Sequence, residues 1–397
     1  MYRLFPSTHR GNHFVTICIA NLLLSFHYFL TLYIHSSFLS IFFPEKLVGI
    51  FYTAGSFINL VLLLLAPAIV KRIGTYALAL ISIVFEIFAI GVFAVSSSPA
   101  LILIATLIHL AVVPLIVFSL DIFLEEESVG ESKTGRIRSF FLTLSNATLV
   151  ISPGIVALLT PRGGVTSESF RNVYLLSFLL LIPAFLVVFH GLKNIKKRIP
   201  TLSSMWVKTK EFFYNKNLRN IFASSLLLQI FYSWMIIYTP IYLRNNIGFD
   251  IPTIGVMFTI MLLPFVLFEL PLGALADKQL GEKEILVFGF IITAVSTAIM
   301  SVIGIPSFLL WTTVLFLTRT GASFIEVMTE TYFFKHVNGS DTDAIGIFRL
   351  TRPLSFIIGP LIATIALSFG PERFIFLTLS LIMLLGLIPA AHLKDTK

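Results

Sequence analysis

Charged side chains are scarce in this sequence: only 12% of its 397 residues are Asp, Glu, Lys or Arg. Apolar side chains make up 57%, well above the near-even apolar share of ordinary soluble domains. A soluble chain of this length would have to hide forty Phe rings in one very large core. The composition therefore argues against a soluble enzyme and places most of the chain in lipid.

Cysteine is nearly absent too, and the single one, Cys18, lies in the first apolar segment. One thiol cannot close a disulfide within the chain, and no C-x-x-C pair exists to hold a metal or to carry redox chemistry. The sequence also lacks a Walker-type glycine loop, an H-E-x-x-H motif and a serine elbow. We therefore expect no enzyme activity, no metal site and no cofactor.

Long apolar runs fill most of the chain, and twelve of them are long enough to cross a bilayer as helices of about 20 residues. Six lie on each side of the one long polar stretch. We expect an all-α polytopic membrane protein of two six-helix bundles, residues 1–192 and 217–397, joined by a cytoplasmic linker at 193–216. The runs cover residues 13–43, 47–70, 74–96, 99–124, 137–160, 169–192, 217–243, 252–275, 283–304, 307–334, 345–369 and 372–392.

Basic residues collect on one side of this predicted topology, which explains the net charge of +8 without a nucleic-acid partner. The first run exceeds the core of a signal peptide, about 7–15 residues, so we expect it to be retained. We expect an integral protein of the plasma (inner) membrane, with both termini in the cytoplasm. The basic residues that fall outside the cytoplasmic loops and termini are Lys46, Arg162, Arg171, Arg244, Arg319 and Arg373.

Three segments of the first half recur in the second, in the same order and at offsets of about 206 to 211 residues. Three matches in order predict a duplicated six-helix unit and hence two pseudo-symmetric bundles. The pairs are Val48–Thr53 with Ile254–Thr259, Lys71–Gly74 with Lys278–Gly281, and Gly135–Arg138 with Gly346–Arg349.

The segment from Gly273 through Asp277 and Lys278 to Gly281 resembles the G-x-L-A-D-[RK]-x-G loop signature of the major facilitator superfamily. In the first half, Val70 stands where this signature has its acid. The resemblance implies alternating-access transport of a small organic solute by a monomer, with protons as the coupled ion. Gly359-Pro360 is weakly similar to an element of the family's antiporters, which favours efflux. Import of a sugar or amino acid, and a non-transporting receptor or lipid scaffold, are the alternatives.

The same resemblance implies a cytoplasmic gate around Asp277. The acid would meet the positive amino end of the fifth helix, where Arg136 and Arg138 add charge. The alternative is that Asp277 caps a loop. Because Val70 cannot make the mirror-image contact, we expect an asymmetric gate.

Few ionisable side chains lie inside the predicted helices, where each costs several kcal/mol and commonly faces a cavity or a partner. Arg319 and Glu326 are seven residues apart, which places them on one helical face. We expect Glu326 to couple protons and Arg319 to orient it or a substrate anion; a static pair is the alternative. Glu86 and Glu269 are the other candidates for the proton carrier, although the resemblance implies a peripheral third helix for Glu86.

Several polar side chains are candidates for a substrate cavity. The resemblance implies that His27 and His109 lie on cavity-lining helices, although a lone histidine on an apolar face more often serves in packing. The spacing of His27 and His35 does not suit a metal. The seventh helix offers polar and aromatic groups suited to stacking on or bonding a small molecule, among them Gln229 and Trp234, beside Tyr232 and Tyr238.

Overall fold

The computed structural model describes residues 8–128, 134–162, 166–192, 209–278, 281–337 and 342–394. Side chains are described throughout these ranges except at 8–12, 125–128, 134–139, 142, 269–270, 273–278 and 342–343. The regular secondary structure of the described ranges is entirely helical. The chain divides into two compact units, which we call the N-terminal unit (residues 1–43 and 54–199) and the C-terminal unit (residues 44–53 and 200–397).

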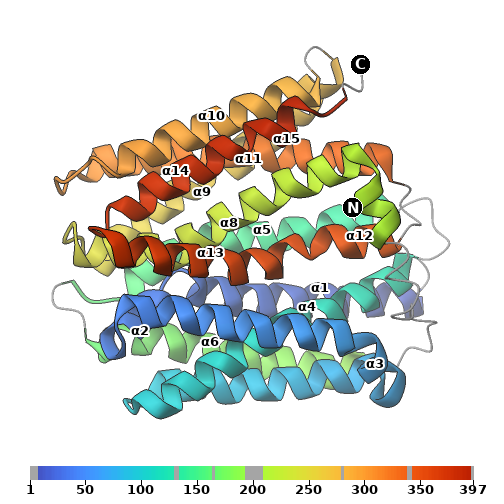
Figure 1. Ribbon diagram of the computed structural model, residues 1–397. Helices are drawn as coiled ribbons and strands as arrows, with labels where there is room; N and C mark the ends of the chain where they lie inside the picture. The colour runs from blue at the N-terminus through green and yellow to red at the C-terminus, as the bar shows by residue number, and fades with distance from the viewer. Residues whose placement is uncertain are drawn as a thin grey trace. The chain divides into compact units, whose positions relative to one another are not determined.

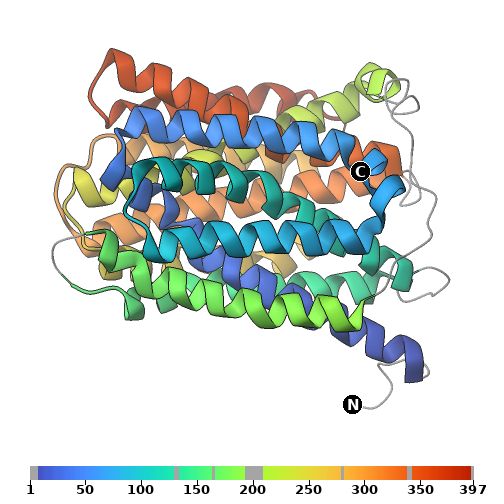
Figure 2. The ribbon, with the colours of Figure 1, turned by 90° about the horizontal axis from the view of Figure 1, so that it is seen from below.

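Helices of membrane-spanning length run side by side within each unit (Figures 1 and 2). The first part of the chain forms α1 (Thr8–Leu32), α2 (His35–Phe42), α3 (Glu45–Val95), α4 (Pro99–Ser128), α5 (Thr134–Leu159) and α6 (Ser167–Gly191). The second part forms α8 (Lys216–Asn245), α9 (Ile251–Lys278), α10 (Glu282–Met300), α11 (Phe308–His336), α12 (Thr342–Arg349), α13 (Thr351–Phe369), α14 (Phe374–Leu385) and α15 (Leu387–Ala391).

The long helix α3 is two membrane helices joined at Gly74. This residue has φ 85° and ψ 157°, a left-handed conformation that glycine adopts without the steric cost of a Cβ. The turn follows Lys71 and Arg72, whose charges favour the membrane surface. The two predicted runs 47–70 and 74–96 therefore correspond to the two halves of α3.

The helix pattern confirms the all-α class and agrees with the twelve predicted spans. In the described part of the chain, ten helical segments are long and apolar enough to cross a membrane; one of them is α3, which contains two spans. The described apolar part of α5, Thr143–Leu159, is a shorter span candidate. The first predicted run, 13–43, is interrupted between α1 and α2, and the last two runs are likewise broken, at Leu350 and at Gly386.

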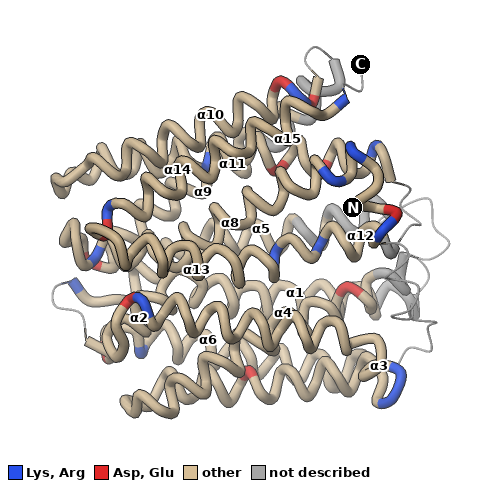
Figure 3. The backbone as a smooth tube through the Cα atoms, in the orientation of Figure 1, with Lys and Arg blue, Asp and Glu red and all other residues tan. Residues whose placement is uncertain are grey.

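The outer surface of the helices is apolar, in contrast to that of a soluble bundle. Phe85 and Phe88 are about half exposed on α3, as is Leu179 on α6. Figure 3 shows Lys, Arg, Asp and Glu gathered mainly toward the ends of the helices. Apolar flanks with charged ends match a lipid core bounded by two aqueous surfaces.

The predicted linker, 193–216, is described only from residue 209 onward. Residues 209–214 are helical, and Phe212 is buried against Phe222 of α8 and Phe333 of α11. This end of the segment therefore packs on the C-terminal unit. The predicted boundaries of the two bundles remain predictions.

Candidate functional site

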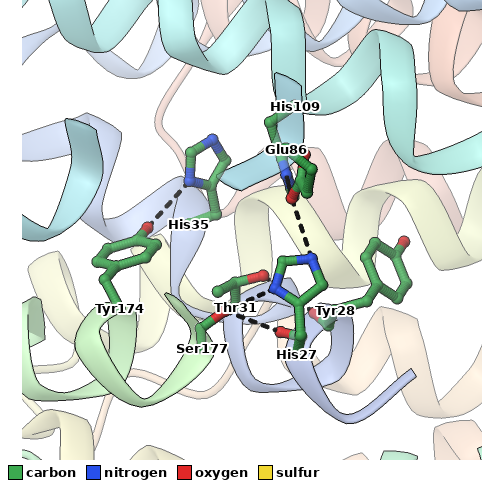
Figure 4. Close-up of polar contacts among 8 residues, drawn as sticks. All are labelled: His27, Tyr28, Thr31, His35, Glu86, His109, Tyr174 and Ser177. Carbon is green, nitrogen blue, oxygen red and sulfur yellow. Dashed lines mark hydrogen bonds and ion pairs between the residues drawn. The ribbon is translucent and has the colours of Figure 1, made fainter. Parts of the chain in front are cut away.

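Three side chains predicted separately meet at one point in the N-terminal unit. Nδ1 of His109 on α4 lies 2.6 Å from Oε1 of Glu86 on α3, and Nε2 of His27 on α1 lies 3.0 Å from the same oxygen (Figure 4). The His27 contact lies within ion-pair distance. Glu86 is 0% exposed, and both histidines are buried. We call these three residues the Glu86 cluster.

The helix positions explain why Glu86 faces inward. Ile83, Glu86 and Ile90 are spaced three and four residues apart, and all three are fully buried. Such spacing defines one face of a helix, and Phe85 and Phe88 lie on the exposed side. The expectation of a peripheral third helix therefore missed that the Glu86 side chain points into the unit.

A second layer of polar groups surrounds the Glu86 cluster. Nδ1 of His27 lies 2.7 Å from Oγ of Ser177, and this hydroxyl donates to the His27 carbonyl oxygen at 3.3 Å. Nδ1 of His35 lies 3.0 Å from the Tyr174 hydroxyl, and the His35 ring centre is 5.2 Å from that of His109. The network joins α1, α2, α3, α4 and α6 (Figure 4). Ser177 and Tyr174 could not be selected from the sequence, because their contacts join helices that are distant along the chain.

A second network lies in the C-terminal unit and contains the predicted pair on α11. The Tyr232 hydroxyl on α8 donates to Oε2 of Glu326 at 2.8 Å. The Arg319 guanidinium carbon lies 5.2 Å from the centre of the Tyr232 ring and 5.3 Å from that of Phe231, within cation–π range. Arg319 is 2% exposed, whereas Glu326 is half-buried. Tyr232 thus contacts both predicted residues.

Glu330, one turn beyond Glu326, has a separate partner. Arg349 of α12 donates two hydrogen bonds to the Glu330 carboxylate, at 2.6 and 3.3 Å. Both side chains are partly exposed. Glu330 thus belongs to a partly exposed ion pair, which makes the residue a useful comparison for Glu326.

The aromatic candidates on α8 take part in helix packing. Nε1 of Trp234 donates to the Gly359 carbonyl oxygen at 2.7 Å, and the indole is 1% exposed. A Cβ on Gly359 would lie 2.3 Å from the Ser233 hydroxyl oxygen, so glycine permits this close approach of α8 and α13. The Tyr238 hydroxyl donates to the Pro360 carbonyl oxygen at 3.3 Å. Gln229 is half-buried.

Most of the predicted gate lies outside the described side chains, and so does Glu269. Gly281 is the one predicted gate residue within the described side chains, and it immediately precedes α10. Val70 packs in an apolar cluster with Ala66, Leu78 and Leu115. The remaining predicted gate residues, which lie outside the described side chains, are Arg136, Arg138, Gly273, Asp277 and Lys278. In the described ranges, no three His, Cys, Asp or Glu side chains are arranged to hold a metal ion.

Membrane-length helices with buried ionisable networks define a polytopic helical membrane protein. Residues 221–396 match the model of the Major Facilitator Superfamily. The crystal structure of nucleoside transporter NupG matches with a TM-score of 0.76 at 13% identity, covering 96% of this chain and 100% of that one. A bacterial homolog of the human lysosomal transporter Spinster, inward-facing and unoccupied, gives 0.75 at 9% identity with 97% of both chains covered. No curated protein matches the sequence.

These matches confirm the predicted resemblance to the major facilitator superfamily. The two solved structures share the fold at low sequence identity. The family model matches the amino-acid sequence of the C-terminal part of the chain. Together they show the fold of an integral membrane protein of this kind, with the family match confined to the C-terminal part of the chain. The roles of the individual site residues remain predictions.

Proposed function

We propose that this protein is a secondary active transporter that moves a small organic solute across the plasma membrane by alternating access, with protons as the coupled ion. Both termini lie in the cytoplasm, and the working unit is a monomer. The fold and the family match support the transporter class. Ionisable side chains inside the spans support ion coupling, because such groups are costly in hydrocarbon and commonly mark ion or substrate pathways.

Glu326 carries the coupled proton in this proposal, and its contact with Tyr232 is the observation that supports it. The carboxylate accepts a hydrogen bond from Tyr232, and Arg319 lies against the same aromatic ring. A donor and a nearby cation favour the ionised carboxylate, whereas a site closed to water favours the protonated acid. Opening and closing the site would therefore drive proton release and uptake. Glu326 is half-buried rather than fully enclosed.

Solute-stimulated proton movement in proteoliposomes tests the proposal. We would load a pH-sensitive dye and present nucleosides, sugars, amino acids and cationic drugs to wild type, Glu326→Gln and Glu330→Gln. Glu330→Gln is the matched control because it removes the same charge one turn away on the same helix. We expect one solute class to move protons in wild type and Glu330→Gln, and none to do so in Glu326→Gln.

The other outcomes separate the alternatives. Proton flux that survives Glu326→Gln would shift the carrier role to Glu86 or Glu269. Solute flux without proton flux would identify a uniporter, and silence from folded protein across the panel would favour a receptor or lipid scaffold. The direction of transport is tested by the orientation of the proton gradient that drives solute accumulation. This orientation distinguishes efflux, which the Gly359-Pro360 element predicts, from import.

A further inference from the structure

The Glu86 cluster holds a carboxyl group inside the N-terminal unit, where water does not solvate its charge. Glu86 is fully buried, and both of its ion-pair contacts in the described chain use the single oxygen Oε1. Its other oxygen, Oε2, has no hydrogen-bond partner among the described residues. A buried carboxylate is costly unless a cation neutralises it, and two imidazoles lie within reach.

The cluster has two forms without net charge, which differ in where its protons lie. In one form Glu86 is protonated and both imidazoles are neutral; in the other Glu86 is ionised and one imidazole is a cation. A protonated carboxyl could donate from Oε1 to one ring nitrogen only, which would leave the second ring nitrogen facing a hydroxyl oxygen, and Oε2 has no acceptor among the described residues. An ionised carboxylate instead presents Oε1 as an acceptor to both rings. The 2.6 Å contact to His109 is also as short as a charge-assisted bond.

Ser177 provides a place for the additional proton on His27. A hydroxyl has one proton to donate and can accept as well. Because the Ser177 hydroxyl donates to the His27 carbonyl oxygen, it is left as an acceptor toward Nδ1 of His27, 2.7 Å away. With Nδ1 donating to Ser177, a further proton on Nε2 would make His27 a cation that faces Glu86.

Two further titratable side chains adjoin the cluster. The ring of His35 on α2 is tilted against that of His109, and its Nδ1 lies 3.0 Å from the hydroxyl of Tyr174 on α6. The bond to Tyr174 holds His35 in place beside His109. The ion pairs of Glu86 in the described chain are with His27 and His109, so these two rings are the sites for the neutralising proton.

We propose that His27, Glu86 and His109 form a proton-binding site inside the N-terminal unit, in which an ionised Glu86 is neutralised by one proton shared between the two imidazoles. The proton binds to a ring nitrogen and leaves to water, so no bond other than N–H changes. While the proton is bound, the ion pairs hold α1 and α4 against α3. Its loss leaves a buried, uncompensated carboxylate and weakens this contact. The site is independent of Glu326 and of the proposed transport.

Infrared spectroscopy of the full-length protein in lipid nanodiscs tests the charge state at neutral pH. We expect the wild type to show no protonated-carboxyl band that Glu86→Gln removes. The paired replacement His27→Gln with His109→Gln removes both imidazoles and with them the shared proton, so Glu86 must become neutral and a new protonated-carboxyl band should appear. A band already present in wild type and absent from Glu86→Gln would overturn the proposal, as would an ionised Glu86 in the paired variant.

Nitrogen-15 NMR of histidine-labelled protein tests where the proton resides. We expect wild type at neutral pH to show an imidazolium signal that Glu86→Gln removes. His190→Gln is the control, because His190 is exposed on α6 and its Nδ1 contacts only the Leu186 carbonyl of its own helix. That variant should keep the signal. Identical imidazolium signals in wild type and Glu86→Gln would refute the site. If Glu86→Gln does not fold, the paired His27→Gln and His109→Gln variant should lose the signal, and a retained signal would refute the site equally.

Discussion

The close crossing of α10 and α11 allows a prediction with a calculable steric cost. A Cβ on Gly321 would lie 2.7 Å from the Gly289 carbonyl oxygen and 2.7 Å from the Thr293 backbone nitrogen. Ordinary contact begins at 3.4 Å, so each distance falls 0.7 Å short. Backbone atoms cannot rotate away as side chains do, and the two helices must separate. We expect Gly321→Ala to lower the free energy of unfolding by about 1–3 kcal/mol, the range for overpacked cores.

Reversible unfolding of the purified protein in mixed micelles measures this loss. Gly346→Ala is the matched control, because a Cβ there meets nothing within 4 Å. Alanine in open helix should be neutral or stabilising by up to about 1 kcal/mol. Equal stability of Gly321→Ala and wild type would show that the helices are not in close contact at this point, and would refute the reasoning.

Three further predictions follow from the remaining contacts. Trp234→Phe removes the bond to the Gly359 carbonyl and should cost about 1 kcal/mol of unfolding free energy; an unchanged denaturation midpoint would contradict this. At matched expression, Asp277→Asn should impair transport far more than Val70→Ala, because Val70 packs in an apolar cluster; similar transport rates would argue against an asymmetric gate. Thermal stability of wild type should fall as pH rises, because the Glu86 cluster is stabilised while its proton is bound and loses that stabilisation on release. Glu86→Gln should remove this component of the pH dependence, and an unchanged profile would count against the site.

The membrane spans could be predicted because a bilayer imposes a simple rule on sequence. About 20 apolar residues are needed per helix, and basic loops mark one side. The finer breaks were harder to predict: the helix interruptions at Leu350 and at Gly386 each lie inside a run that was predicted as one span. Glycine occurs in membrane helices for several reasons, so its presence alone does not locate a turn.

The candidate sites were predictable only in part. Helical spacing placed Arg319 and Glu326 on one face, but nothing in the sequence indicated that Tyr232, about ninety residues earlier, contacts both. Likewise His27 and Ser177 are 150 residues apart, and their contact depends on how α1 and α6 are rotated. Periodicity reports which residues share a face of one helix, whereas a network between helices depends on packing that no local pattern encodes.

The two acidic sites belong to separate networks, and this separation predicts how their variants combine. Glu86 contacts His27 and His109 in the N-terminal unit, whereas Glu326 contacts Tyr232 in the C-terminal unit. Replacements that share no partner usually add within about 0.3–0.5 kcal/mol. At one fixed pH, the stability loss of the double variant Glu86→Gln with Glu326→Gln should therefore equal the summed losses of the single variants. A larger deviation would mean that protonation at one site alters the other, and the two carboxylates would have to be treated as one coupled system.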